Sequence, residues 1–121
     1  MSRFVSIKTE LRDGDILKES LRELKCTVIP QTEMTLYAKT QPISFLSVTP
    51  FGRVGFRIND QGQYEMVGDE EVLKKQGNFL DRLTQRYAYN KVVKEAKKAG
   101  FSFIKEEVME DNSIRVVIRK W

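Results

Sequence analysis

The chain has 121 residues, of which 40% are hydrophobic and 31% charged, values that fit one globular domain spanning residues 1–121 rather than a disordered chain. It contains no histidine and a single cysteine, which excludes imidazole catalysis, zinc sites that use histidine, thiolate metal clusters and internal disulfides. The net charge is +4, and the whole excess lies in residues 81–121, which carry ten basic and six acidic side chains.

The first part of the chain predicts a strand, a helix and a second strand. Residues 5–11 alternate apolar and polar side chains, the period-two pattern of a strand with one buried face. Residues 12–15 break this pattern and supply an aspartate that can cap a helix, and apolar residues at helical spacing follow as far as Lys25. The short apolar stretch 26–29 predicts the second strand, and we interpret Cys26 within it as a buried hydrophobic residue.

The middle of the chain shows no helical periodicity and predicts strands. Two strands are expected at residues 35–39 and 44–49. A hairpin is expected to follow, formed by residues 54–58 and 63–67 around a polar turn that contains glycine.

Two glycines, Gly52 and Gly55, flank Arg53 and suggest at first sight a loop that binds phosphate. Such a loop opens a helix and carries either a Lys-Ser/Thr pair or a third glycine. Here the glycines flank a predicted strand instead, so the sequence does not predict a phosphate site.

A long helix is predicted in the last third of the chain. Residues 68–77 are polar and acidic, with a short helical turn at 72–73. Asn78 stands where it can cap a helix that runs to Ala99, and Gly100 is the natural stop after it.

Two further segments, residues 101–109 and 114–121, predict a terminal hairpin. The predicted order is therefore strand–helix–strand, a run of antiparallel strands, a long helix and a hairpin. A mostly antiparallel sheet with helices packed on one face accommodates this order. We expect an α+β fold with a ferredoxin-like or related split β-α-β arrangement.

The long helix carries two apolar stripes that cannot both face one sheet, because at about 100° per residue they lie nearly opposite each other. The first comprises Phe79, Leu80, Leu83 and Tyr87, and the second comprises Ala88, Tyr89, Val92, Val93, Ala96 and Ala99. Either the helix breaks where the stripes change over, with Asn90 as a second cap, or its halves pack against different partners, such as another subunit, another protein or the loop 68–77. The candidate interaction surface comprises Gln85, Arg86, Tyr87, Tyr89 and Asn90.

The second half of this helix is also basic. The candidate basic patch combines it with the last predicted strand and comprises Lys91, Lys94, Lys97, Lys98, Arg115 and Arg119. The simplest interpretation is a solvated helix surface, and the functional alternative is a site for phosphates or for an acidic partner. No RNA-binding motif accompanies the charge. The carboxylate pairs lack the spacing of glycosidase or calcium sites, so we predict no catalytic, metal-binding or cofactor-binding residues.

One string, Thr-Gln-Arg-Tyr-Ala-Tyr-Asn at residues 84–90, resembles a particular family. Residues 2–9, Ser-Arg-Phe-Val-Ser-Ile-Lys-Thr, and residues 111–121, which end in Trp121, resemble the start and the finish of the same family. This is the hypothetical chloroplast open reading frame thirty-five family, also called domain of unknown function twelve fifty-seven. The resemblance spans the chain except residues 30–50. It implies a cyanobacterial, plastid-like or phage setting, and it implies neither an activity nor catalytic residues.

We expect a soluble, non-enzymatic adaptor or accessory domain that binds an unidentified protein, or a second copy of itself, through the candidate interaction surface. The first alternative is a nucleic-acid-binding module that uses the candidate basic patch, with binding that weakens steeply as salt rises. The second alternative is a small-molecule-binding domain with an apolar pocket between sheet and helices. We expect no cofactor and no membrane partner, and a location in the cytoplasm or the plastid stroma.

Overall fold

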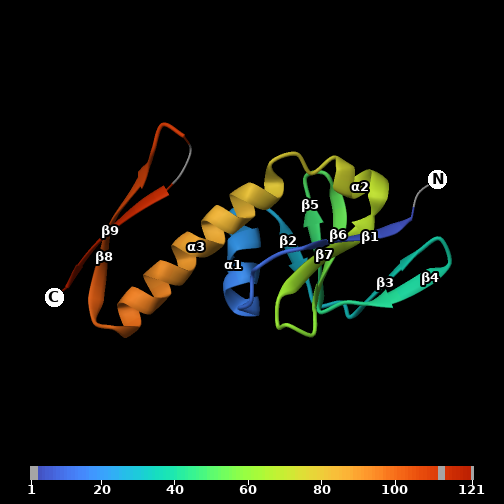
Figure 1. Cartoon of the computed structure of the whole chain (residues 1–121), viewed down its shortest axis with the longest axis horizontal. Coiled ribbons are helices and arrows are strands. Elements are labelled where there is room, and N and C mark those ends of the chain that lie inside the picture. Colours follow the sequence, from blue (N-terminus) through green and yellow to red (C-terminus); the bar gives the residue numbers. More distant parts are fainter. Residues whose placement is uncertain (1–2, 112–113, 121) are drawn as a thin grey trace.

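The N-terminal strand, β1 (Phe4–Lys8), leads into helix α1 (Gly14–Glu23) and strand β2 (Thr27–Ile29), as the sequence predicts. The structure, a computed structural model, describes the backbone of residues 3–111 and 114–120 and the side chains of residues 3–101 and 109–111. The remaining elements in chain order are β3 (Glu33–Leu36), β4 (Lys39–Pro42), β5 (Phe45–Thr49), β6 (Gly52–Ile58), β7 (Tyr64–Asp69), α2 (Glu70–Lys74), α3 (Phe79–Lys98), β8 (Phe101–Val108) and β9 (Ile114–Lys120) (Figure 1).

A five-stranded sheet in the order β1-β7-β6-β5-β2 forms the centre of the fold. Every neighbouring pair in it is antiparallel, so the chain direction reverses at each step and the two edge strands, β1 and β2, run parallel to each other. Helix α1 joins these two edge strands, and β5, β6 and β7 lie between them. The fold is therefore α+β with a split β-α-β unit, which confirms the predicted fold class.

Helices α1 and α3 cover one face of this sheet. Phe45, Phe56 and Met66 point to that face and are buried in one core cluster with Leu17 of α1 and Leu83 of α3. The rings of Phe45 and Phe56 stack with their centroids 5.2 Å apart. Burial of large apolar side chains between sheet and helices is the main source of stability in a domain of this size.

The hairpin formed by β3 and β4 covers part of the opposite face. Leu46 alternates with Phe45 along β5, so it points away from the helices and packs with Met34 and Ile43. Gly55 lies beneath Ile43, and a Cβ atom on Gly55 would lie 2.7 Å from Ile43 Cγ2. The sheet therefore carries a core on each face, and the glycine at position 55 lets the β3–β4 hairpin approach the sheet closely.

The predicted strand at residues 35–39 is wrong, because a turn falls inside it. Tyr37 and Ala38 have φ values of 53° and 62°, in the left-handed range that both central residues of a type I′ hairpin turn adopt. Asn and Gly are the residues that announce such a turn in a sequence. Since neither is present at these positions, the turn gave no local signal.

Helix α1 ends in a Schellman motif that has lysine where glycine is usual. The N–H of Lys25 donates to the carbonyl of Arg22, and the N–H of Cys26 donates to the carbonyl of Leu21, each at 3.0 Å. Lys25 has a φ of 66°, the left-handed conformation that costs a residue with a Cβ roughly 1–2 kcal/mol.

Substitution of this lysine by glycine, Lys25→Gly, is expected to raise the free energy of unfolding by about 0.5–1 kcal/mol, because the relief of strain exceeds the entropic cost of glycine. Urea denaturation measures the change. Lys75→Gly is the matched control, since Lys75 also follows a helix but has a φ of −86°, and it should lower the stability. A loss of stability in Lys25→Gly would contradict the strain.

Helix α3 is continuous from Phe79 to Lys98, so the predicted alternative in which it breaks at Asn90 is wrong. Asn78 occupies the N-cap position as predicted, although its side chain makes no capping hydrogen bond in the described part of the chain. Instead, Gln76 Oε1 accepts a hydrogen bond from the N–H of Leu80 at 3.0 Å. An amide side chain two residues before the predicted cap therefore satisfies a backbone N–H group in the first turn of this helix.

Figure 1 shows how α3 crosses the molecule: it starts near α2, passes over α1 and ends beside β8. Strands β8 and β9 form a separate two-stranded sheet, which confirms the predicted terminal hairpin. This hairpin lies at the opposite end of the molecule from the β3–β4 hairpin (Figure 1). Helix α3 thus packs along α1 on the body of the domain and connects it to the terminal hairpin.

Candidate functional site

Tyr87, one of the residues of the candidate interaction surface, is only 6% exposed. Its hydroxyl oxygen accepts hydrogen bonds from the backbone N–H groups of Asp13 at 2.8 Å and Arg12 at 3.2 Å. Asp13 in turn caps α1 by accepting a hydrogen bond from the N–H of Ile16 at 3.1 Å, and this bond holds the pKa of the Asp13 carboxyl below its usual value. Tyr87 therefore fastens α3 to the segment that starts α1.

Asn90 is buried between α3 and α1. Its Nδ2 donates hydrogen bonds to Ser20 Oγ at 3.0 Å and to Glu23 Oε1 at 2.7 Å. Ser20 is fully buried, and its hydroxyl donates to the carbonyl of Ile16 at 2.7 Å. Buried polar contacts of this kind fix how two helices sit against each other, because a shift would leave the buried groups without partners.

The inner face of α3, the side that contacts α1, runs through positions 83, 87, 90 and 94, spaced as one helix face requires. Leu83 is fully buried at one end, and at the other end Lys94 Nζ lies 3.6 Å from Asp13 Oδ2. The face therefore continues through tyrosine, asparagine and lysine after its aliphatic start. This explains why the hydrophobic periodicity indicated a change of the buried face, although a single face of α3 contacts the region of α1 along its length.

The outer stripe of α3, which we define as Tyr89, Val92 and Val93, projects from other sides of the helix. Val92 is 45% exposed, whereas Tyr89 and Val93 are partly buried. Ala96, one turn further on, is buried. The outer stripe therefore presents apolar surface on the half of α3 that leads to β8.

The candidate interaction surface is consequently divided in two. Tyr87 and Asn90 are buried in contacts with α1, while Gln85 is exposed and Arg86 and Tyr89 are partly exposed. The guanidinium carbon of Arg86 lies 5.0 Å from the centroid of the Tyr89 ring, within the range of a cation–π contact.

The candidate basic patch is divided as well. Lys91, Lys97 and Lys98 are exposed along the second half of α3, while Lys94 is paired with Asp13. The side chains of Arg115 and Arg119 lie outside the described residues.

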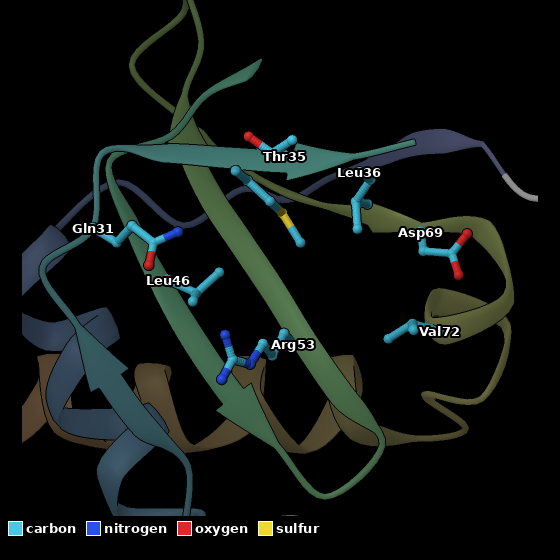
Figure 2. Close-up of a pocket in the computed structure, with 8 residues that line it drawn as sticks. Gln31, Thr35, Leu36, Leu46, Arg53, Asp69 and Val72 are labelled. Carbon is cyan, nitrogen blue, oxygen red and sulfur yellow. The ribbon is translucent and has the colours of Figure 1, made fainter. Parts of the chain in front are cut away.

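A pocket of about 190 Å³ lies between the β3–β4 hairpin, the sheet and α2 (Figure 2). Its lining comes from five elements and one loop and comprises Gln31, Met34, Thr35, Leu36, Leu46, Arg53, Asp69 and Val72. A wider hollow of about 490 Å³ lies where β1 ends beside α3, and its lining is mainly polar: Lys8, Thr9, Glu10, Gln63, Leu80, Asp81 and Thr84. The partly apolar pocket thus lies between the sheet, the β3–β4 hairpin and the short helix α2, whereas the second functional alternative predicts a pocket between the sheet and the helices.

Two glycines shape this pocket around Arg53. A Cβ atom on Gly52 would lie 2.8 Å from Val72 of α2, and one on Gly55 would lie 2.7 Å from Ile43 beneath the hairpin. Gly52 and Gly55 thus let α2 and the β3–β4 hairpin approach the sheet closely. This role of the two glycines could not be predicted from the sequence, because α2 and the β3–β4 hairpin come from distant parts of the chain.

The described residues contain no group of three acidic or cysteine side chains that could hold a metal ion. Among them, no helix is both long and apolar enough to cross a membrane. Cys26 is 5% exposed, and burial raises the pKa of its thiol. The interpretation of Cys26 as a buried hydrophobic residue is therefore confirmed.

Comparisons with known proteins give the family. A family model described as "Protein of unknown function (DUF1257)" matches residues 20–117. The chain is 34% identical to "Uncharacterized protein ycf35" of Guillardia theta, and the match covers 100% of this chain and 98% of that protein. It is 28% identical to the proteins of the same name in Pyropia yezoensis and Cyanophora paradoxa, with the same coverage. No solved structure matches the chain.

The matched region contains the string at residues 84–90, which carries the resemblance to this family. Tyr87 and Asn90, two residues of that string, form the hydrogen bonds between α3 and the region of α1. The chain belongs to the DUF1257 family of proteins of unknown function.

Proposed function

We propose that this protein is a non-enzymatic adaptor that binds another protein through the outer stripe of α3 and the adjoining β8–β9 hairpin. The observation that carries the proposal is the 45% exposure of Val92 on a helix whose inner face is already occupied by α1. An exposed branched apolar side chain flanked by partly buried Tyr89 and Val93 is the composition of a small protein-binding patch.

The terminal hairpin gives a second reason to propose that a partner binds at this surface. A two-stranded hairpin is at best marginally stable in water without further packing. Within the described strands, β8 and β9 pair only with each other, so each has an edge open to another strand. We therefore propose a partner that adds an extended strand to this hairpin and places an apolar side chain against Val92.

Binding of nucleic acid is the alternative for the same half of α3. Exposed Lys91, Lys97 and Lys98 favour it, whereas the pairing of Lys94 with Asp13 reduces the charge available to phosphates. The relatives carry a plastid open reading frame name, and we propose a plastid-stromal or cytoplasmic location for this chain.

Capture of partners from a cyanobacterial or plastid extract tests the proposal. Val92→Glu is expected to lower recovery of a stoichiometric protein partner at least about tenfold, because it places a charge in an apolar contact. Ile58→Glu is the matched control, since Ile58 is 51% exposed on β6, and it should leave recovery unchanged. Equal recovery with Val92→Glu and wild type would contradict the proposal. Recovery of nucleic acid alone, lost on Lys91→Glu with Lys97→Glu, would replace it with the alternative.

A further inference from the structure

The pocket beneath the β3–β4 hairpin is separate from the outer stripe of α3. It lies on the face of the sheet opposite α1 and α3, since Leu46 at its floor belongs to the core cluster of Met34 and Ile43. An inference about this pocket therefore holds or fails independently of the proposed protein-binding function.

Arg53 supplies the pocket with an available positive charge. Its side chain is exposed, and among the described residues no hydrogen bond or ion pair occupies its guanidinium. In Figure 2 the side chain extends from β6 toward Leu46, and Gln31 lies beyond Leu46 on the same side of the pocket. A guanidinium presents parallel N–H donors that match the two oxygens of a carboxylate.

The middle of the pocket is apolar. Met34 and Leu46 are 5% and 2% exposed, and Leu36 and Val72 are partly buried beside them. These four side chains come from β3, β5 and α2, so the pocket depends on the hairpin and the short helix both lying against the sheet (Figure 2). Such a lining suits the hydrocarbon part of a small ligand.

A negative charge limits what can bind at the other end. Asp69 lines the pocket on the side away from Gln31 (Figure 2). Its Oδ1 is buried and has no hydrogen-bond partner among the described residues, and the residue as a whole is partly exposed, so the carboxylate adds negative potential at this end of the pocket. A second anionic group on the ligand would meet this charge at close range.

From these features we infer that the pocket binds a small monocarboxylate with an apolar body. The carboxylate pairs with the guanidinium of Arg53, and the hydrocarbon part lies among Met34, Leu36, Leu46 and Val72. The volume of about 190 Å³ limits the ligand to the size of a short fatty acid or a comparable keto acid. The single charge matches one unpaired arginine, and Asp69 selects against dicarboxylates.

Titration of the full chain with hexanoate, hexanamide and adipate tests this inference, with ¹³C-labelled methionine methyl groups as the readout. Met34 reports on the pocket, while Met66 lies in the helix-side core and serves as the internal reference. Hexanoate is expected to shift the Met34 signal saturably with a Kd of about 1 mM. Hexanamide should bind about tenfold more weakly or worse, because it lacks the charge-assisted hydrogen bonds.

Two substitutions test whether the charge of Arg53 determines the preference for hexanoate. Arg53→Gln should remove the preference for hexanoate over hexanamide, whereas Lys39→Gln, which removes an exposed cation from β4 outside the pocket lining, should keep it. Adipate should bind more weakly than hexanoate to the wild type, and Asp69→Asn should narrow that gap. The inference is overturned if hexanoate leaves the Met34 signal unchanged to 50-fold above the expected Kd, or if hexanamide or adipate binds as tightly as hexanoate.

Discussion

Replacement of Tyr87 by alanine is expected to lower the free energy of unfolding by about 3–5 kcal/mol, the usual cost of removing a buried aromatic side chain. Tyr87→Phe, which removes only the hydroxyl, should still cost about 1–3 kcal/mol. The reason is that the backbone N–H groups of Arg12 and Asp13 both lose their acceptor. Urea denaturation of the two variants measures both values.

The control for the hydroxyl is Tyr37→Phe, because Tyr37 is 60% exposed at the tip of the β3–β4 hairpin. That change should stay within about 0.5 kcal/mol of the wild type. A Tyr87→Phe variant as stable as wild type would contradict the role of Tyr87 in fastening α3 to the segment before α1.

The second large loss of stability is expected on substitution of Gly55. Gly55→Ala should cost about 1–3 kcal/mol, because the new methyl group would lie 2.7 Å from Ile43 Cγ2 inside a packed core. Ile43→Ala alone should cost about 2–5 kcal/mol through the cavity that it leaves. The double variant should cost less than the sum by about 1 kcal/mol or more, since the new methyl group fills part of the space that Ile43 vacates.

Gly68→Ala is the matched control for this clash. Gly68 lies on the neighbouring strand β7, and a Cβ atom there would make contacts of 3.6 Å and longer. It should be neutral or slightly stabilising, because alanine reduces the entropy of the unfolded chain. Strict additivity of Gly55→Ala and Ile43→Ala would show that these residues do not meet and that the β3–β4 hairpin lies elsewhere.

The parts of the fold that sequence predicted well are those with a local pattern. Strand β1, helix α1 and the hairpin of β6 and β7 each have a clear period and a turn of the expected residue types. The turn at Tyr37 and Ala38 has no such residues, so the β3–β4 hairpin was taken for a single strand. A left-handed turn made of tyrosine and alanine is stabilised by the packing of Met34 and Ile43, which no local pattern reports.

The structural roles of Tyr87 and Asn90 could not be predicted from the sequence. The string at residues 84–90 was singled out for its resemblance to the family and for the change of apolar stripe, and Asn90 was interpreted as a cap or a surface residue. Its partners, Ser20 and Glu23, lie some seventy positions earlier in the chain, at separations of 70 and 67 residues. A polar residue on a buried helix face looks like a break in the apolar stripe unless the partner helix is known. The pocket around Arg53 was missed for the same reason, since its lining joins residues as distant as Gln31 and Val72.

Tyr87 and Asn90 hold α3 in place through its inner face, and we propose a separate task for the outer stripe, the binding of a partner. Partner capture by Tyr87→Phe and Val92→Glu, at a temperature where circular dichroism shows both to be folded, tests this division most directly. We expect Tyr87→Phe to be less stable than wild type and still to recover the partner, and we expect Val92→Glu to be as stable as wild type and to lose the partner. Loss of the partner in folded Tyr87→Phe together with its retention in Val92→Glu would contradict this division.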